Sequence, residues 1–213
     1  MKTIALHSSG SRLLHAVLAL CLAPPCLPQG NSQADANALQ VSCLPGERGF
    51  LRASLRGAIE ADLDWRGASI QCEGGARPDG RGIRVSFLGP TDAYGRRLRL
   101  VFGVAAPPGS ARTATAATNV TLIVEGGARV YTTRGDERCA IDAMVQEPLP
   151  VASPAGPTDN SANAGRLYRI AARGYCIDPA TLLDGSAPLF INRFDFAGVA
   201  RFEDNELHAA TRN

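Results

Sequence analysis

Three carboxylates alternate along one stretch of the chain, at Glu60, Asp62 and Asp64. Residues two apart on a β-strand share a face and lie about 7 Å apart, which suits the carboxylate pair of a glycoside hydrolase if a groove covers them. Carboxylates so placed also bind calcium. Without a groove they form a solvated face, in which we expect Glu60 opposite Ser54 and Asp62 opposite Arg52. The solvated face is the favoured interpretation, and the three acids are kept as candidate ligand-binding residues.

Arginines form the second set of candidate ligand-binding residues. Arg97 and Arg99 share one face of an expected strand, and Arg84 lies on the strand before it. A guanidinium row can bind carboxylate or phosphate groups, such as those of an anionic glycan or a lipid head group. The alternative is a solvated face on which the arginines pair with acids. A second row has the same two interpretations and comprises Arg166, Arg169 and Arg173.

The first 34 residues have the pattern of an export signal. They carry Lys2 and Arg12 but no acid, and an apolar run of eleven residues spans 13–23. Such a run suits a signal peptide and is too short to span a bilayer. Ser32-Gln33-Ala34 resembles a cleavage site, so we expect a mature chain of 35–213 that is periplasmic or secreted. No later run is long enough to predict a transmembrane segment.

Removal of that segment limits the available chemistry. It contains the only lysine and two of the three histidines, and it leaves as many arginines as acids, 20 of each. His208 stays, close to the chain end, where we expect a frayed tail. Catalytic triads, Schiff bases and histidine metal sites are therefore excluded. We expect no catalytic residue, no metal and no cofactor, and the absence of net charge argues against nucleic-acid binding.

Two further motifs have structural explanations. Arg134-Gly135-Asp136 spells an adhesion tripeptide, but three residues arise easily by chance and a charged turn accounts for them. Trp65 falls on the apolar side of an alternating segment, so core packing is favoured over a sugar-stacking platform.

The mature chain alternates like a set of strands. Over 50–66 the odd positions are apolar or small and the even positions are mostly charged, with a three-residue turn expected at Arg56-Gly57-Ala58. Similar patterns predict strands at 82–88, 97–104, 119–125, 128–133, 139–146, 166–176 and 189–203. We therefore expect an all-β protein of about eight to ten strands, an antiparallel sandwich that is jelly-roll-like.

One domain is expected over 35–213, with a long flexible loop at 147–165. Four cysteines in an exported chain predict two disulfides. Cys139 opens one strand and Cys176 closes the next, so antiparallel pairing sets them opposite each other and sets Val145 near Ile170. Cys43 and Cys72 then pair by elimination. If export is wrong, four thiols or a Cys₄ metal site become the alternative.

These observations favour a non-catalytic exported module that binds a ligand or partner, with an anionic glycan as candidate. One alternative is a carboxylate-based polysaccharide hydrolase, which two acids facing each other across a groove would support. Another is an assembly subunit that pairs through an exposed strand edge. A shallow aromatic or arginine-lined surface would support the binding module.

We predict that the exported protein begins near Asp35, because the cleavage pattern ends at Ala34. Intact-mass measurement of the exported chain tests this expectation. A mass that retains residues 1–30 would contradict it.

Overall fold

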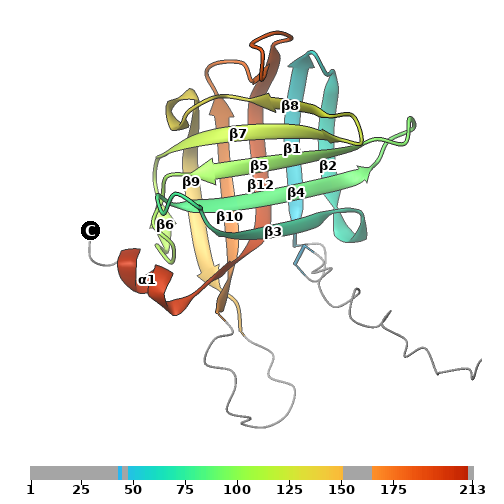
Figure 1. The fold of residues 1–213 in the computed structure, drawn as a ribbon. Helices are drawn as coiled ribbons and strands as arrows, with labels where there is room; N and C mark the ends of the chain where they lie inside the picture. The colour runs from blue at the N-terminus through green and yellow to red at the C-terminus, as the bar shows by residue number, and fades with distance from the viewer. Residues whose placement is uncertain (1–42, 45–47, 151–164, 211–213) are drawn as a thin grey trace, which may run out of the picture. The chain divides into compact units, whose positions relative to one another are not determined.

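The computed structural model describes residues 43–44, 48–150 and 165–210, all within the unit Asn37–Asn213. The expected signal peptide and most of the 147–165 loop lie outside the described residues. The described chain is almost entirely β-structure (Figure 1). Its strands are β1 Phe50–Gly57, β2 Ala61–Arg66, β3 Gln71–Ala76, β4 Ile83–Thr91, β5 Arg97–Val104, β6 Arg112–Thr113, β7 Ala116–Glu125, β8 Arg129–Thr132, β9 Cys139–Pro148, β10 Arg166–Cys176, β11 Thr181–Leu182 and β12 Leu189–Phe202.

The strands form one antiparallel sheet in the order β2-β1-β12-β10-β9-β7-β5-β4-β3. Strands β2 and β3 lie at opposite ends of that order, yet only the 3₁₀ turn Gly67–Ser69 and Ile70 separate them in sequence. Four residues span little more than 13 Å even when extended, so the two ends of the sheet must meet at this corner. Figure 1 shows the result, in which β3, β4, β5 and β7 cross in front of β1, β12, β10 and β9. The expected antiparallel sandwich is confirmed, with its layers crossed.

Glycines allow the sheet to close. A Cβ atom on Gly74 of β3 would lie 2.7 Å from the Val199 carbonyl oxygen of β12, and one on Gly75 would lie 3.1 Å from that of Arg201. β3 therefore packs against the second half of β12 because it has no side chain there. Gly198 of β12 similarly makes room for the Phe87 ring, which a Cβ would approach to 2.8 Å.

The core fills the space between the crossed layers. Its centre is an aromatic cluster with ring centroids 4.6–6.3 Å apart, made by Phe87, Phe102, Phe194 and Phe196. In most predicted strands alternate residues point into this core, as the patterns of the sequence indicate, but bulges interrupt the alternation in β9 and β12. In β9, Met144 and Gln146 are buried after the bulge in place of Ala143 and Val145, which the period-two pattern places on the face of Cys139 and Ile141.

A two-residue hairpin loop at Gly126-Gly127, which the paired glycines predict, does not form, because residues 126–128 make a three-residue turn between β7 and β8 with positive φ at Gly126 and Ala128. The sheet has 12 strands, more than the expected eight to ten, because it includes two short strands of two residues each, β6 and β11.

The hairpin over 50–66 turns later than predicted. Ser54 pairs with Asp62 and Arg52 with Asp64, so the expected pairs Ser54–Glu60 and Arg52–Asp62 are wrong by two residues. Gly57 belongs to β1, and its N–H donates to the Glu60 carboxylate at 2.7 Å across the turn. Because the shift is even, each side chain keeps its face of the sheet.

Both predicted disulfides, Cys139–Cys176 and Cys43–Cys72, are present. Cys139 lies directly opposite Cys176 in the β9–β10 ladder. A bulge between Arg173 and Gly174 then shifts the register by one, so Val145 pairs with Ala171, the residue next to Ile170, close to its predicted position.

The chain end also differs from expectation. His208 lies on a helix, α1 Asp204–Ala210, whereas a frayed tail was predicted. The Glu206 carboxylate accepts a hydrogen bond from the Glu203 N–H at 2.8 Å, a return bond that stabilises the first turn. Arg166 of β10 contacts Asp204 at 3.0 Å and attaches the helix to the sheet. No helix in the described ranges is long and apolar enough to cross a membrane.

Gly74→Val should lower the free energy of unfolding by about 1–3 kcal/mol, because the new side chain collides with backbone oxygens of β12 and β4. Urea denaturation with the disulfides intact measures this change. Gly127→Ala is the control, since a Cβ there meets only ordinary contacts at 3.4 Å or more, and it should stay within about 1 kcal/mol of wild type. Equal effects in the two variants would contradict the closure by glycine.

Candidate binding cleft

The arginine row named from the sequence is largely paired with acids. Glu73 of β3 lies 3.5 Å from Arg84 and 3.6 Å from Arg99, and Arg99 also contacts Glu125 of β7 at 2.7 Å. Arg97 donates to the Gly89 carbonyl at 2.9 Å. The row therefore lies on the outer face of the front layer with most of its charge compensated.

The three candidate carboxylates are each held by arginine. Glu60 lies 3.8 Å from Arg56, and Asp62 accepts hydrogen bonds from the same guanidinium at 2.8 and 3.0 Å. Asp64 accepts from Arg66 at 2.7 and 2.8 Å. The Arg56 hydrogen bonds lower the pKa of Asp62, and those from Arg66 lower the pKa of Asp64. A general acid needs a raised pKa, so Asp62 and Asp64 are not arranged for that role.

In the second arginine row, two of the three arginines pair with acids. Arg166 pairs with Asp204 and Arg169 with Glu147 at 3.1 Å. Arg173 is exposed and makes no ion pair within the described residues. The described part of the chain contains no cluster of three or more His, Cys, Asp or Glu side chains suited to a metal ion.

One hollow of about 500 Å³ gathers arginines from segments far apart in sequence. Arg77, only 10% exposed, contacts Asp79 at 2.7 Å and Asp136 at 2.9 Å, and Asn119 donates to Asp136 at 2.5 Å. Arg138, also in the lining, pairs with Asp178. The aspartate of the adhesion tripeptide is therefore engaged in a structural network, as the charged-turn interpretation predicts. This network joins the β3–β4 turn to β7 and to the 3₁₀ turn Asp136–Arg138.

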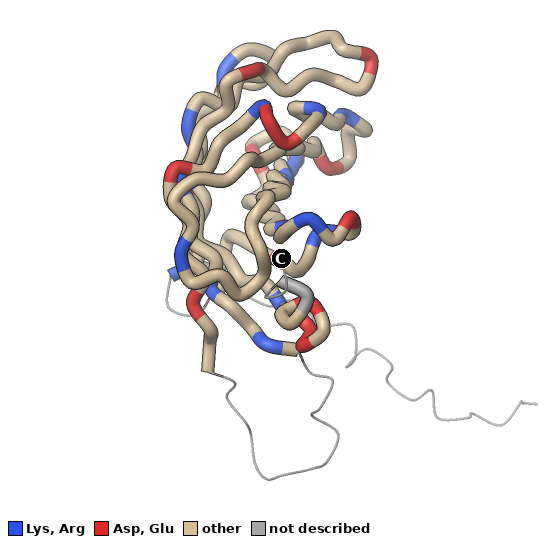
Figure 2. The backbone as a smooth tube through the Cα atoms, turned by 90° about the vertical axis from the view of Figure 1, so that its left-hand side faces the viewer, with Lys and Arg blue, Asp and Glu red and all other residues tan. Residues whose placement is uncertain are grey.

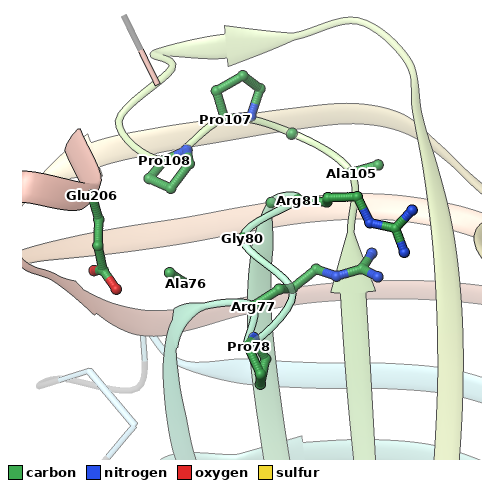
Figure 3. A pocket seen from close by; sticks show the side chains of 11 residues that line it. Ala76, Arg77, Pro78, Gly80, Arg81, Ala105, Pro107, Pro108 and Glu206 are labelled. Carbon is green, nitrogen blue, oxygen red and sulfur yellow. The ribbon is translucent and has the colours of Figure 1, made fainter. Parts of the chain in front are cut away.

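A second hollow, of about 420 Å³, lies beside the β3–β4 turn and α1 (Figure 3). Its walls are small and apolar, including Pro78, Pro107 and Pro108, and Glu206 lies at one side. Figure 3 shows Arg77 and Arg81 extending away from Glu206. Buried Gln146 fixes the wall by donating to the Pro107 carbonyl and accepting from the Gly109 N–H, both at 2.9 Å.

The third hollow, which we call the interlayer cleft, has a volume of about 370 Å³. It opens between the β1–β2 hairpin of one layer and the β4–β5 hairpin of the other, next to the ends of β7 and β8. Its apolar floor consists of buried or half-buried residues, Ile59, Ala61, Leu63, Trp65, Leu98 and Val124. These side chains point inward like the core but lie where it reaches the surface.

The rim of the interlayer cleft is polar and exposed. Asp92 accepts hydrogen bonds from the backbone N–H groups of Arg96 at 2.8 Å and Tyr94 at 2.9 Å. The Arg96 N–H contributes most to the lowered pKa of Asp92, and the Tyr94 N–H adds to it. The Arg96 guanidinium contacts Asp92 at 2.8 Å and lies 4.9 Å from the centre of the Tyr94 ring. This rigid turn holds Tyr94, 81% exposed, at the mouth of the cleft.

Arg129 is the cation of the rim that has no acidic partner. It pairs with Val124 across the β7–β8 hairpin and therefore faces the same side as the floor. It is exposed and makes no ion pair in the described part of the chain. Asp184, which lines a neighbouring hollow with Arg129, accepts hydrogen bonds from Ser186 at 2.8 and 2.6 Å.

Sequence patterns do not predict this cleft, because its lining comes from five strands and two hairpin turns. Its sequence signals are weak. Tyr94 is an aromatic residue inside a turn, and Leu98 continues the inward pattern of β5 toward the strand end. Trp65 does pack on its apolar side as predicted, against Gly89, where a Cβ would lie 2.4 Å from the indole ring.

Comparison with known protein families, curated proteins and solved structures finds no match to this chain.

Asp79→Asn should reduce the dependence of the free energy of unfolding on pH at acidic pH. The Arg81 backbone N–H and then the Arg77 guanidinium hydrogen-bond the Asp79 carboxylate and lower its pKa to about 2. Ionised Asp79 thus contributes stability that is present above pH ~4 and is lost as the pH falls toward 2. The variant should be less stable than wild type at pH 6 and equal to it near pH 2, as measured by urea denaturation across that range.

The control is Asp142→Asn, which removes an exposed carboxylate that forms no ion pair among the described residues. If both variants lose the same stability at pH 6, the network around Arg77 is not the source of the effect.

Proposed function

We propose that this protein is an exported, non-catalytic binding module and that its ligand is an anion held in the interlayer cleft. The observation that carries this proposal is the combination of an apolar floor with Arg129 at the rim. A cation without a partner beside a preformed cleft supplies both orientation and charge to a ligand.

Export is supported by the two disulfides, since such bonds persist in oxidising compartments. A periplasmic or secreted location agrees with the signal pattern in the sequence. The disulfides tie β3 to the segment before β1 and join β9 to β10, so the sandwich depends on an environment that keeps them oxidised.

The hydrolase alternative lacks a supporting observation among the described residues. Glu60, Asp62 and Asp64 each contact an arginine of the same hairpin and do not face one another across a groove. The interlayer cleft has two acids on its rim, of which Asp92 is committed to its own turn and to Arg96.

The assembly alternative is supported no better. One end of the sheet, β3, packs against β12. The other end, β2, carries charged side chains on its outer face at Asp62, Asp64 and Arg66, and charges of this kind discourage pairing with another strand.

Trp65 provides the test, because it is the single tryptophan of the chain and lines the cleft. We expect an anionic probe, either an oligogalacturonate or decanoate, to change the Trp65 emission in a saturable manner. Arg129→Gln should weaken the binding roughly tenfold, since a charge-assisted hydrogen bond is lost. Neither probe should be consumed, as product analysis after long incubation would show.

Arg112→Gln is the matched control, because Arg112 is exposed on β6 and makes no ion pair within the described residues. It should leave the affinity unchanged. If neither probe changes the emission, or if the two arginine variants behave alike, the proposal is wrong. Cleavage of the oligogalacturonate would show an enzyme instead.

A further inference from the structure

We infer that the ligand of the interlayer cleft is an anionic amphiphile, a single alkyl chain that ends in a carboxylate, phosphate or sulfate group. This inference rests on the proposed function and specifies the chemistry of its ligand. It follows from how apolar and charged side chains are separated within the lining.

The separation is between floor and rim. Trp65 and Val124 are buried, and Ile59, Ala61, Leu63 and Leu98 are half-buried, whereas every charged lining residue is exposed. A glycan carries hydroxyl groups along its length, and these would lose water without gaining partners on such a floor. An alkyl chain makes no such demand and gains the free energy of burial.

The floor is continuous with the core of the sandwich. Leu98 is followed by Leu100 and Phe102 on the same face of β5, and Leu63 by Trp65 on β2. An alkyl chain lying in the cleft would therefore cover the part of the protein core that neither layer of the sandwich covers. The mouth of a sandwich or barrel is a common position for such a ligand.

The rim selects the charge of the head group. Arg96 is engaged with Asp92 and with the Tyr94 ring, so its charge is already compensated. Arg129 faces the floor side of the β7–β8 hairpin without an acidic partner. A head group at the mouth would pair with Arg129 while its chain enters between Leu63 and Leu98, so charge and apolar surface are complementary to one molecule.

This arrangement makes affinity depend on chain length. Each methylene transferred to an apolar site improves affinity about fourfold, so two added carbons should improve it by roughly fifteenfold until the cleft is filled. We expect hexanoate, octanoate and decanoate, titrated below their micelle concentrations against Trp65 emission, to follow this series. Decanol, which has the chain without the charge, should bind roughly tenfold more weakly than decanoate.

Two variants test whether the alkyl chain of the ligand lies in the interlayer cleft. Ala61→Phe places a ring in the cleft and should abolish the gain from octanoate to decanoate, and Leu98→Asn should reduce it. Leu167→Asn is the control, because Leu167 is half-buried on β10 and does not line the cleft. Thermal unfolding with the disulfides intact establishes that each variant is folded, and Ala61→Phe decides the matter if Leu98→Asn is not.

Three results would overturn the inference. In the first, affinity does not change with alkyl-chain length, and oligogalacturonate binds in a manner that Arg129→Gln weakens. The proposed binding function would then hold, and its ligand would be a glycan. Failure of every anionic probe would overturn the proposed function as well. A dimer in gel filtration that Ala61→Phe converts to a monomer would show that a second copy of this chain covers the cleft.

Discussion

Four residues constrain this sheet more than any others, because Gly67–Ser69 and Ile70 are all that separates two strands at opposite ends of its order. So short a link forces the ends of the sheet together and folds it into crossed layers. Gly74 and Gly75 then let β3 lie against the backbone of β12, and Cys72 fixes that end of β3 to Cys43. The closure protects the β3 edge and buries the aromatic cluster around Phe102.

The same closure explains where the protein is open. β12 has 14 residues, of which the first part pairs with β1 and the last part packs against β3. The β1–β2 hairpin extends from the closed part of the sheet, and around the interlayer cleft its inward face meets the β4–β5 hairpin and the ends of β7 and β8. The interlayer cleft is the space that this partial contact leaves, so a binding site arises there without any special motif.

Arginine is the only long cation of the described chain, and Figure 2 shows its positions along the backbone interspersed with those of acids. Many arginines contact a carboxylate on a neighbouring strand or in the same hairpin, which compensates charge locally and leaves little long-range field. Against that background the arginines that form no ion pair among the described residues, which include Arg112, Arg129 and Arg173, are informative. Arg129 is such a residue and lies at the mouth of a cleft, whereas Arg173 is on an open face.

Local pattern alone determined much of this protein. Alternation located the longer strands from β4 to β12 closely but missed the two-residue strands β6 and β11, since side chains two apart share a face only over a strand long enough to repeat. The positions of Cys139 and Cys176 at strand ends identified their pairing. If residues 1–34 are removed as the sequence predicts, the chain loses its only lysine and two of its three histidines, which argues against several chemistries. Register and site depended on tertiary structure. The centre of the 50–66 hairpin turn lies one residue later than its glycine suggests, which shifts each pairing partner by two, and Glu60 closes the turn onto Gly57. The closed sheet decides which strands lie side by side. This arrangement determines which arginines pair with acids, and it brings Leu63, Leu98 and Arg129 to one opening. Alternation along a single strand carries no information about such neighbours.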